Sequence, residues 1–156
     1  MYLTLKFLHI FAVIMFLGNI TTGLFWHRQA ARTRNAALFA HTMDGIIRSD
    51  RWFTIPGVTA IVAIGVAMAI DMHLPILSTR WILWTLVALS VSGIIFAVWL
   101  IPLQRKMHAF AREGVVSGNF DYAAYHRLAQ RWEAWGLASL LLPYIGLAFM
   151  VFRPAL

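Results

Sequence analysis

Four stretches of the chain consist almost entirely of apolar residues, and the polar residues collect between them. These stretches are residues 7–26, 52–70, 81–101 and 134–152. Each is close to the length of about 20 residues that a helix needs to cross the hydrocarbon core of a bilayer. None alternates as a membrane barrel strand does, and lipid cannot satisfy an unpaired backbone. The pattern therefore predicts an all-α integral membrane four-helix bundle, with residues 1–156 forming a single transmembrane domain.

Composition supports this prediction. Hydrophobic residues make up 61% of the chain and charged residues only 12%, whereas soluble domains average roughly 45–50% and about 25%. The net charge of +7 could indicate a nucleic-acid partner, but the cations lie at the ends of the apolar stretches, as they do in membrane proteins. We therefore expect the lipid bilayer, and no nucleic acid, as the partner. The absence of cysteine excludes thiolate chemistry and disulfides.

The distribution of Lys and Arg predicts the orientation. Ten of the 13 lie between the first and second or between the third and fourth stretches, and only Lys6, Arg80 and Arg153 lie on the other side. Because short cytoplasmic loops are enriched in Lys and Arg, both termini are expected outside. The expected location is a bacterial inner membrane with periplasmic termini.

The two basic loops are long enough to contain structure. Residues 36–48 mix apolar and polar positions as an interfacial amphipathic helix does. Asp50 is a candidate cap for the second span, residues 114–119 are expected to form a turn, and Asp121 is a candidate cap for the helix that leads into the fourth span.

Features inside the spans predict helix contacts and a kink. Pro143 should kink the fourth span and free the carbonyl of Ser139. Small residues four apart permit close helix approach. These pairs are Asn19 with Gly23, Ala63 with Ala67, and Gly93 with Ala97.

His9 is the most informative polar residue, because it lies about one turn inside the first span. Ionisable side chains within a span are costly and usually face the bundle interior, where they mark ligand or cofactor sites. Ala12, Phe16, Gly23 and His27 follow His9 along one helical face. His9 is thus a candidate cofactor or metal ligand, and the alternative is a neutral histidine hydrogen-bonded to a neighbouring helix.

A second candidate group ends the second span at the same level. Met68, Met72 and His73 lie there, and thioether and imidazole groups suit reduced copper, while a His–Met pair is also a haem axial set. Alternatively, Met68 faces lipid and His73 belongs to a loop.

The remaining histidines lie among cations, where solvated or hydrogen-bonded positions are expected: His27, His41, His108 and His126. His41, Asp44 and Arg48 share a helical face. Asp50 beside Arg51 and Glu133 beside Arg131 are expected to form interfacial ion pairs, with a proton path through the acids as the alternative.

No nucleophile elbow, phosphate loop, dinucleotide fingerprint or zinc protease motif is present, so no hydrolase is indicated.

Short segments in a fixed order resemble a bacterial family of predicted four-span membrane proteins of unknown function. They include residues 2–9, Gly18-Asn19, residues 49–54, 102–104 and 125–128, and Leu142-Pro143. The first span also resembles that of the HemJ-type protoporphyrinogen oxidases, whose Leu-His-Ile segment supplies a haem-binding histidine, and of the CopD-type copper-resistance proteins. The resemblance implies a role only for His9, because the later lysine region of the oxidases has no counterpart in this chain.

Three functions follow from these observations. The first is b-type haem binding for electron transfer or redox sensing, with His9 as one axial ligand and His73, Met68 or Met72 as the other. The second is copper handling by His9, Met68, Met72 and His73, which for transport would need a homo-oligomer. The third is a non-catalytic scaffold or subunit that binds no cofactor and packs against a membrane partner protein.

Overall fold

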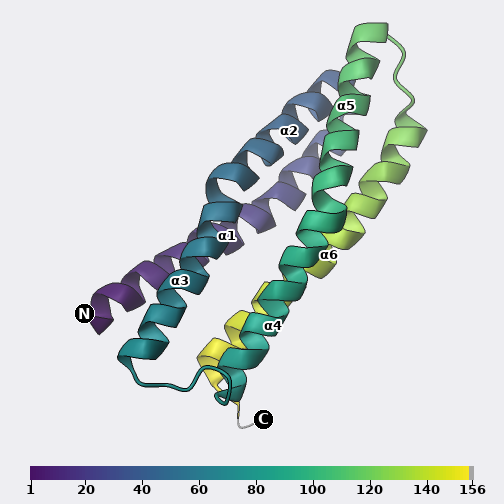
Figure 1. Ribbon diagram of the computed structural model, residues 1–156. Coiled ribbons are helices and arrows are strands. Elements are labelled where there is room, and N and C mark those ends of the chain that lie inside the picture. Colours follow the sequence, from purple (N-terminus) through teal and green to yellow (C-terminus); the bar gives the residue numbers. More distant parts are fainter. Residues whose placement is uncertain (155–156) are drawn as a thin grey trace.

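The computed structural model describes residues 1–154 and contains four long helices, two of which include a π-helical turn (Figure 1). In chain order the elements are α1 (Tyr2–Ala31), α2 (Ala36–Ser49), η1 (Asp50–Thr54), α3 (Ile55–Asp71), α4 (Arg80–Ile95), η2 (Phe96–Leu100), α5 (Ile101–Ser117) and α6 (Tyr122–Phe152). The described residues contain no strand. The predicted all-α bundle is confirmed, and each of its four helices is long and apolar enough to cross a membrane.

The second and third helices are much longer than their apolar stretches. Residues 36–71 form one helix of 36 residues and residues 80–117 one of 38. At 1.5 Å per residue the first is about 54 Å long, whereas the hydrocarbon core is about 30 Å thick. The basic loops expected from the sequence are therefore largely helical continuations of the spans.

A proline explains each π-helical turn. Pro56 and Pro102 lie at the second position of the helices that follow η1 and η2, and proline has no N–H to donate. The turns before them are wider than an α-turn: the amide of Ile55 bonds to the carbonyl of Asp50, and the amide of Ile101 to that of Phe96. Such turns recur at functional sites.

The helices connect through short turns with local caps. Asp121 Oδ1 accepts from the amide of Ala124 at 2.9 Å, which confirms the predicted cap. Asn35 Oδ1 accepts from the amide of Ala37 at 2.9 Å and caps α2 in the same way. The turn predicted at residues 114–119 starts later, because α5 runs to Ser117 and ends on Gly118 with φ of 68°, a conformation that glycine adopts without strain.

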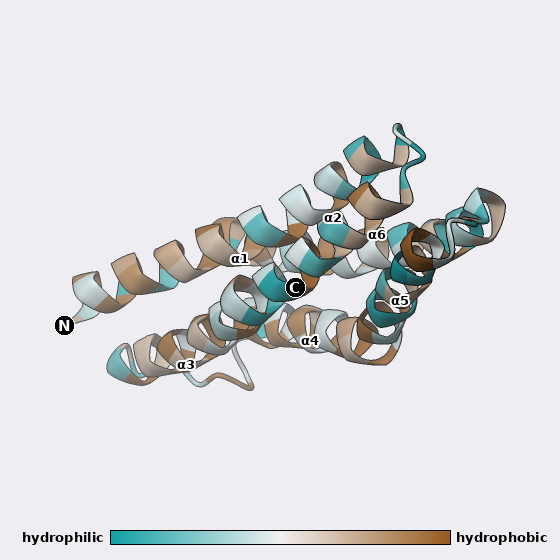
Figure 2. Cartoon of the chain, turned by 90° about the horizontal axis from the view of Figure 1, so that it is seen from above, coloured by the Kyte–Doolittle hydropathy of each residue, from teal (hydrophilic) through white to brown (hydrophobic). Residues whose placement is uncertain are grey.

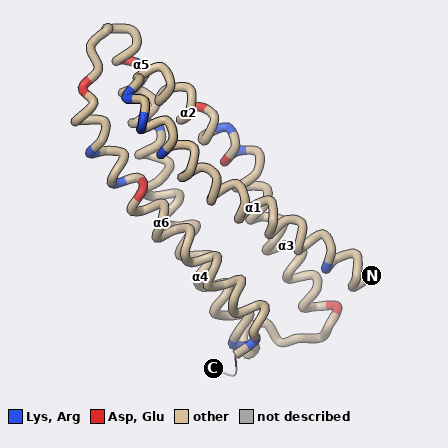
Figure 3. The backbone as a smooth tube through the Cα atoms, turned by 180° about the vertical axis from the view of Figure 1, so that it is seen from behind, with Lys and Arg blue, Asp and Glu red and all other residues tan. Residues whose placement is uncertain are grey.

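Charge divides the bundle into two ends. The α1–α2 and α5–α6 turns lie together at one end, and the N-terminus, the α3–α4 turn and the end of α6 lie at the other (Figure 1). Lys and Arg concentrate towards the first end, which we call the basic end, and few lie at the sparsely charged end (Figure 3). The fold thus places the ten cations of the two basic loops at one end and Lys6, Arg80 and Arg153 at the other, as predicted.

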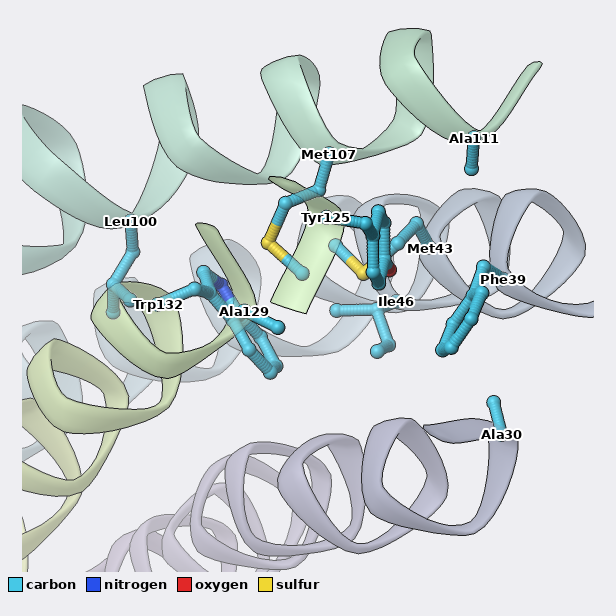
Figure 4. Packing of buried hydrophobic residues seen from close by; sticks show 10 residues of the cluster. All are labelled: Ala30, Phe39, Met43, Ile46, Leu100, Met107, Ala111, Tyr125, Ala129 and Trp132. Atoms are coloured by element: carbon cyan, nitrogen blue, oxygen red, sulfur yellow. The ribbon is translucent and has the colours of Figure 1, made fainter. Parts of the chain in front are cut away.

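The apolar core lies near the basic end, where all four long helices pack together. Ten buried residues form this core, and Figure 4 shows them interdigitating: Ala30, Phe39, Met43, Ile46, Leu100, Met107, Ala111, Tyr125, Ala129 and Trp132. Phe39 and Met43 of α2 are fully buried. The interpretation of residues 36–48 as an interfacial segment is therefore wrong, since its apolar face packs against protein and continues the bundle.

Apolar side chains cover the outside of the spans. Phe7 is 67% exposed, Ile14 64% and Trp52 72%. Hydrophobic positions recur along α1, α3 and α4, while α5 and the turns carry much of the hydrophilic colour (Figure 2). Exposure of so many large apolar side chains is explained by contact with lipid.

The carbonyl that Pro143 was predicted to free is confirmed, whereas two of the predicted contacts are not. Pro143 lies within α6, and the Ser139 carbonyl, which proline leaves without a helical donor, accepts from Ser92 Oγ on α4 at 2.7 Å. A Cβ on Gly23 or Gly93 would meet nothing within 4 Å, so these glycines do not mark close helix approaches. The close approaches occur at other glycines: Gly57 on Phe16, Gly65 on His9, Gly136 on Leu24 and Gly146 on Thr85.

Candidate cofactor site

His9 lies on the inward face of α1, against α3. A Cβ on Gly65 of α3 would lie 3.1 Å from His9 Cε1 and 3.5 Å from Nδ1, so the absence of a side chain at Gly65 makes room for the imidazole. Nδ1 is buried next to the backbone of Ile61 on α3, and the geometry between the two falls outside that of an ordinary hydrogen bond. This position is close to that of a neutral histidine hydrogen-bonded to a neighbouring helix, which was the alternative for His9. Ala12, Phe16 and His27 on the same face are buried, as predicted.

His9 lines a large apolar cavity in the sparsely charged half of the bundle. There α1 packs on α3 and α4 packs on α6, while α3 and α4 do not pack on each other within the described residues. The space between the two pairs, which we call the outer cavity, has a volume of about 690 Å³. Ligand sites commonly measure about 300–1,000 Å³ and combine apolar walls with a few polar groups. The outer cavity has this character.

The structure brings three of the four predicted site residues to this cavity. Met68 and Met72 of the α3 end line it together with His9. His73 does not line it; the residue is exposed just beyond α3 with φ of 53°. The alternative for Met68 was a position that faces only lipid, and the fold does not place it there. The alternative for His73 was a loop position, and the fold does place it there.

Two cations lie at the wall of the outer cavity. Lys6 of α1 and Arg153, at the end of α6, both line it. The guanidinium of Arg153 lies over the Trp81 ring, 5.1 Å from its centroid. None of the described residues that line this cavity is acidic, so among them an anionic group on a ligand would meet only positively charged side chains.

The sequence suggested Asp50 as a cap of the second span, but Asp50 does not cap it. The helix continues through it, and its carboxylate is 8% exposed inside the bundle. Thr54 Oγ1 donates to Oδ1 at 2.7 Å and Gln104 Nε2 donates to Oδ2 at 2.8 Å. Asn19 Nδ2 lies 3.3 Å from Oδ1 and donates to Thr54 Oγ1 at 2.8 Å. The expected ion pair with Arg51 is absent, because Asp50 continues the buried face of Met43 and Ile46 while Arg51 is exposed.

His27 is fully buried and hydrogen-bonded, so of the two environments expected for it the hydrogen-bonded one is correct and the solvated one is wrong. Its Nδ1 lies 3.1 Å from Glu133 Oε1, and its Nε2 lies 3.3 Å from the Tyr125 hydroxyl. A neutral ring that donates from Nδ1 and accepts at Nε2 satisfies both contacts. Arg28 Nε donates to the other oxygen of Glu133 at 3.2 Å, so Glu133 pairs with α1 and not with Arg131. The spacing of 18 residues from His9, five helical turns, was the sequence feature that indicated this burial.

The other histidine group does not form a site. Arg48 Nε bonds to Asp44 Oδ2 at 2.9 Å, whereas His41 on the same helix is exposed. Among residues 1–154 no three His, Asp or Glu side chains gather as metal ligands. A metal bound by His9 would therefore have to draw its other ligands from groups such as the two methionine sulfurs.

Comparison with known proteins identifies a family but no function. No curated protein and no solved structure matches the sequence, so the likeness of the first span to HemJ-type and CopD-type proteins has no further support. The family described as "Predicted integral membrane protein (DUF2269)" matches residues 3–154. Since this match extends over nearly the whole length, the chain belongs to the DUF2269 family of integral membrane proteins.

Proposed function

We propose that this membrane protein binds b-type haem in the outer cavity, with His9 as an axial ligand, and serves electron transfer or redox sensing. The observation that carries the proposal is the position of His9: a half-buried imidazole in the wall of an apolar cavity of about 690 Å³. Four-helix bundles commonly hold cofactors between facing helices.

Three features of the cavity fit a haem group. Its walls come from two helix pairs, which leaves a space between layers suited to a flat molecule. Its polar lining is sparse, which suits a largely apolar macrocycle. The carboxylates of the propionates would find Lys6 and Arg153 on the lining, and charge-assisted hydrogen bonds to such groups are strong.

Either Met68 or Met72 would be the second axial ligand. Both line the cavity, one turn apart on α3, and a His–Met pair is an established haem ligand set. When bound, the haem iron would supply one-electron redox chemistry. The protein would supply the ligands, an apolar environment that controls the potential, and exclusion of water.

Copper handling is a second candidate, favoured by the two thioethers that share the cavity with His9. Methionine sulfur and imidazole suit Cu(I). This alternative predicts copper bound in a fixed ratio to protein by elemental analysis, lost when Met68 and Met72 are both changed to leucine. A scaffold role predicts neither copper nor haem and tolerance of His9→Ala.

The orientation is part of the proposal. The ten cations of the basic end support a cytoplasmic position for that end. In a bacterial inner membrane the outer cavity and both termini would then face the periplasm, and a redox partner would approach from that side.

An absorption spectrum tests the proposal. Protein produced with ample haem and purified in mild detergent is expected to show a Soret band that shifts on reduction with dithionite. His9→Ala should abolish the band, and His41→Ala, which changes an exposed histidine outside the cavity, should keep it. A colourless wild-type preparation, or a band that His9→Ala leaves unchanged, would refute haem ligation by His9.

A further inference from the structure

A second, smaller cavity lies inside the bundle, closer to the basic end. It has a volume of about 80 Å³, and we call it the central chamber. Seven polar side chains from the four long helices line it: Asn19, Ser49, Asp50, Thr54, Ser92, Gln104 and Ser139. A water molecule occupies about 30 Å³ in the liquid and needs two to four polar partners. The central chamber therefore offers both the space and the partners for water.

Asp50 is the one ionisable group on the chamber wall. Its Oδ1 accepts from Asn19 and Thr54, whereas its Oδ2 accepts only from Gln104. A carboxylate oxygen has two lone pairs, so Oδ2 keeps one that no side chain of the described residues uses. That oxygen can accept a further hydrogen bond, or a proton, from water in the chamber.

Among residues 1–154, no cation forms an ion pair with this carboxylate. The elements packed against Asp50 present only neutral groups to it: Asn19 from α1, Thr54 from η1 and Gln104 from α5. The charged residues along its own helix and along α5 are turned outward or paired. Arg51, Arg105 and Lys106 are exposed, and Arg48 pairs with Asp44. The titratable groups of α1 and α6 on the basic side, His27, Arg28 and Glu133, bond to one another, with Tyr125 on His27.

Helical spacing accounts for this placement. Asp50 follows the buried Phe39, Met43 and Ile46 at spacings of four, three and four residues, so it lies on the same inward face. Thr54 lies four residues further on and forms a hydrogen bond of 2.7 Å with Asp50. Asp50 and Thr54 begin and end η1, and Phe96 and Leu100, which begin and end η2, line the same chamber.

We propose that Asp50 is a proton-binding site, at which water in the central chamber protonates and deprotonates the carboxyl group. On binding, a hydronium ion transfers its proton to the free lone pair of Oδ2, forming an O–H bond and leaving water; release is the reverse. Burying an ion without a counter-charge costs several kcal/mol, and protonation removes that cost. The hydrogen bonds from Asn19, Thr54 and Gln104 stabilise the ionised form. The carboxyl group can therefore exist in this chamber in both its protonated and its ionised form.

The position of this site gives it a functional context. Phe16 and Leu89 line both the central chamber and the outer cavity, so one layer of side chains separates Asp50 from the space beside His9. A proton gained or lost at Asp50 would act electrostatically on any charged or redox-active group in the outer cavity. The proton site itself does not depend on what that cavity binds.

Infrared difference spectroscopy tests the proposal on the full chain in detergent or lipid. Spectra recorded across an acid-to-alkaline titration should contain a protonated-carboxyl C=O band that disappears as pH rises. Asp50→Asn should remove this band, and Asp44→Asn, a carboxylate of the same helix that is ion-paired outside the chamber, should retain it. Gln104→Met, which removes the only donor to Oδ2, should shift the midpoint of the Asp50 band to higher pH, because the ionised form loses a stabilising hydrogen bond.

Two results would overturn the proposal. One is that the pH-dependent carboxyl bands of the folded wild type are the same as those of Asp50→Asn. If Asp50→Asn does not fold, the proposal is instead refuted when folded Gln104→Met has the same band midpoint as the wild type. The other is a band that depends on Na⁺ and not on pH when Na⁺ is replaced by a bulky organic cation, which would make the chamber a metal-cation site.

Discussion

Gly65 holds the imidazole of His9 so closely that a Cβ at this position would lie 3.1 Å from Cε1. This distance is shorter than an ordinary carbon–carbon contact of about 3.5–4.0 Å. The glycine therefore fixes the depth at which the ring lies against α3 and the direction in which it faces the outer cavity. The pair links a backbone feature of one helix to the candidate ligand of another.

Gly65→Ala should accordingly impair the candidate site. The added methyl displaces the His9 ring by a few tenths of an ångström, and haem content in matched preparations should fall. Gly93→Ala is the control, because nothing lies within 4 Å of its new Cβ; it should leave haem content unchanged and stabilise the helix by about 0.4–1 kcal/mol. Equal haem content in the two variants would show that the contact does not position His9.

The bond from Ser92 Oγ to the Ser139 carbonyl should contribute measurably to stability. Ser92→Ala leaves that carbonyl without a donor beside Pro143, and the free energy of unfolding should fall by about 1–3 kcal/mol. Thermal or denaturant unfolding in detergent measures it. Ser139→Ala should cost less, because the backbone carbonyl still accepts from Ser92. The reverse order of the two costs would contradict this account.

His27 should be the most sensitive histidine for stability. His27→Ala opens a cavity and leaves the Tyr125 hydroxyl and Oε1 of Glu133 without a partner, so a loss of about 2–5 kcal/mol is expected. His41→Ala, an exposed control, should be within about 0.5 kcal/mol of wild type. A double-mutant cycle of His27→Ala with Glu133→Gln should give a coupling of about 0.5–3 kcal/mol, and strict additivity would mean that the pair does not interact.

The sequence predicted the gross fold because its strongest pattern reflects lipid. Apolar length alone locates four spans, and the separation of Lys6, Arg80 and Arg153 from the other cations places the loops at opposite ends. Local rules also predicted single features well. Asp121 forms the expected cap, and the carbonyl of Ser139 needs the outside donor that Pro143 implied.

Polar residues near the basic end were harder to predict, since their environment depends on packing. His27 and Asp50 are flanked by arginines, which made exposed or ion-paired positions the natural interpretation. His27 is buried because α2 and α5 extend the bundle well beyond the apolar stretches. Asp50 turns inward because it continues the face of Phe39, Met43 and Ile46, and the burial of that face against protein could not be known before α2 was placed. The glycine beneath His9 is likewise a contact between helices that no local pattern indicates.

Topology reporters can test the orientation. Alkaline phosphatase, which is active only outside the cytoplasm, should be active when fused to the C-terminal end and inactive when fused after Gly118. A green fluorescent protein, which folds in the cytoplasm, should give the opposite result. Activity of phosphatase at Gly118 would place the basic end outside, contrary to the expectation from its ten cations.

The measurement that tests the central claim most directly is rescue of a His9→Gly variant by imidazole. If His9 ligates haem in the outer cavity, this variant should lose the Soret band and its shift on reduction. Free imidazole, which fits the space vacated by the side chain, should restore both, while imidazole added to a His41→Gly control should change nothing. Haem content and spectrum that are unaffected by His9→Gly would contradict the account.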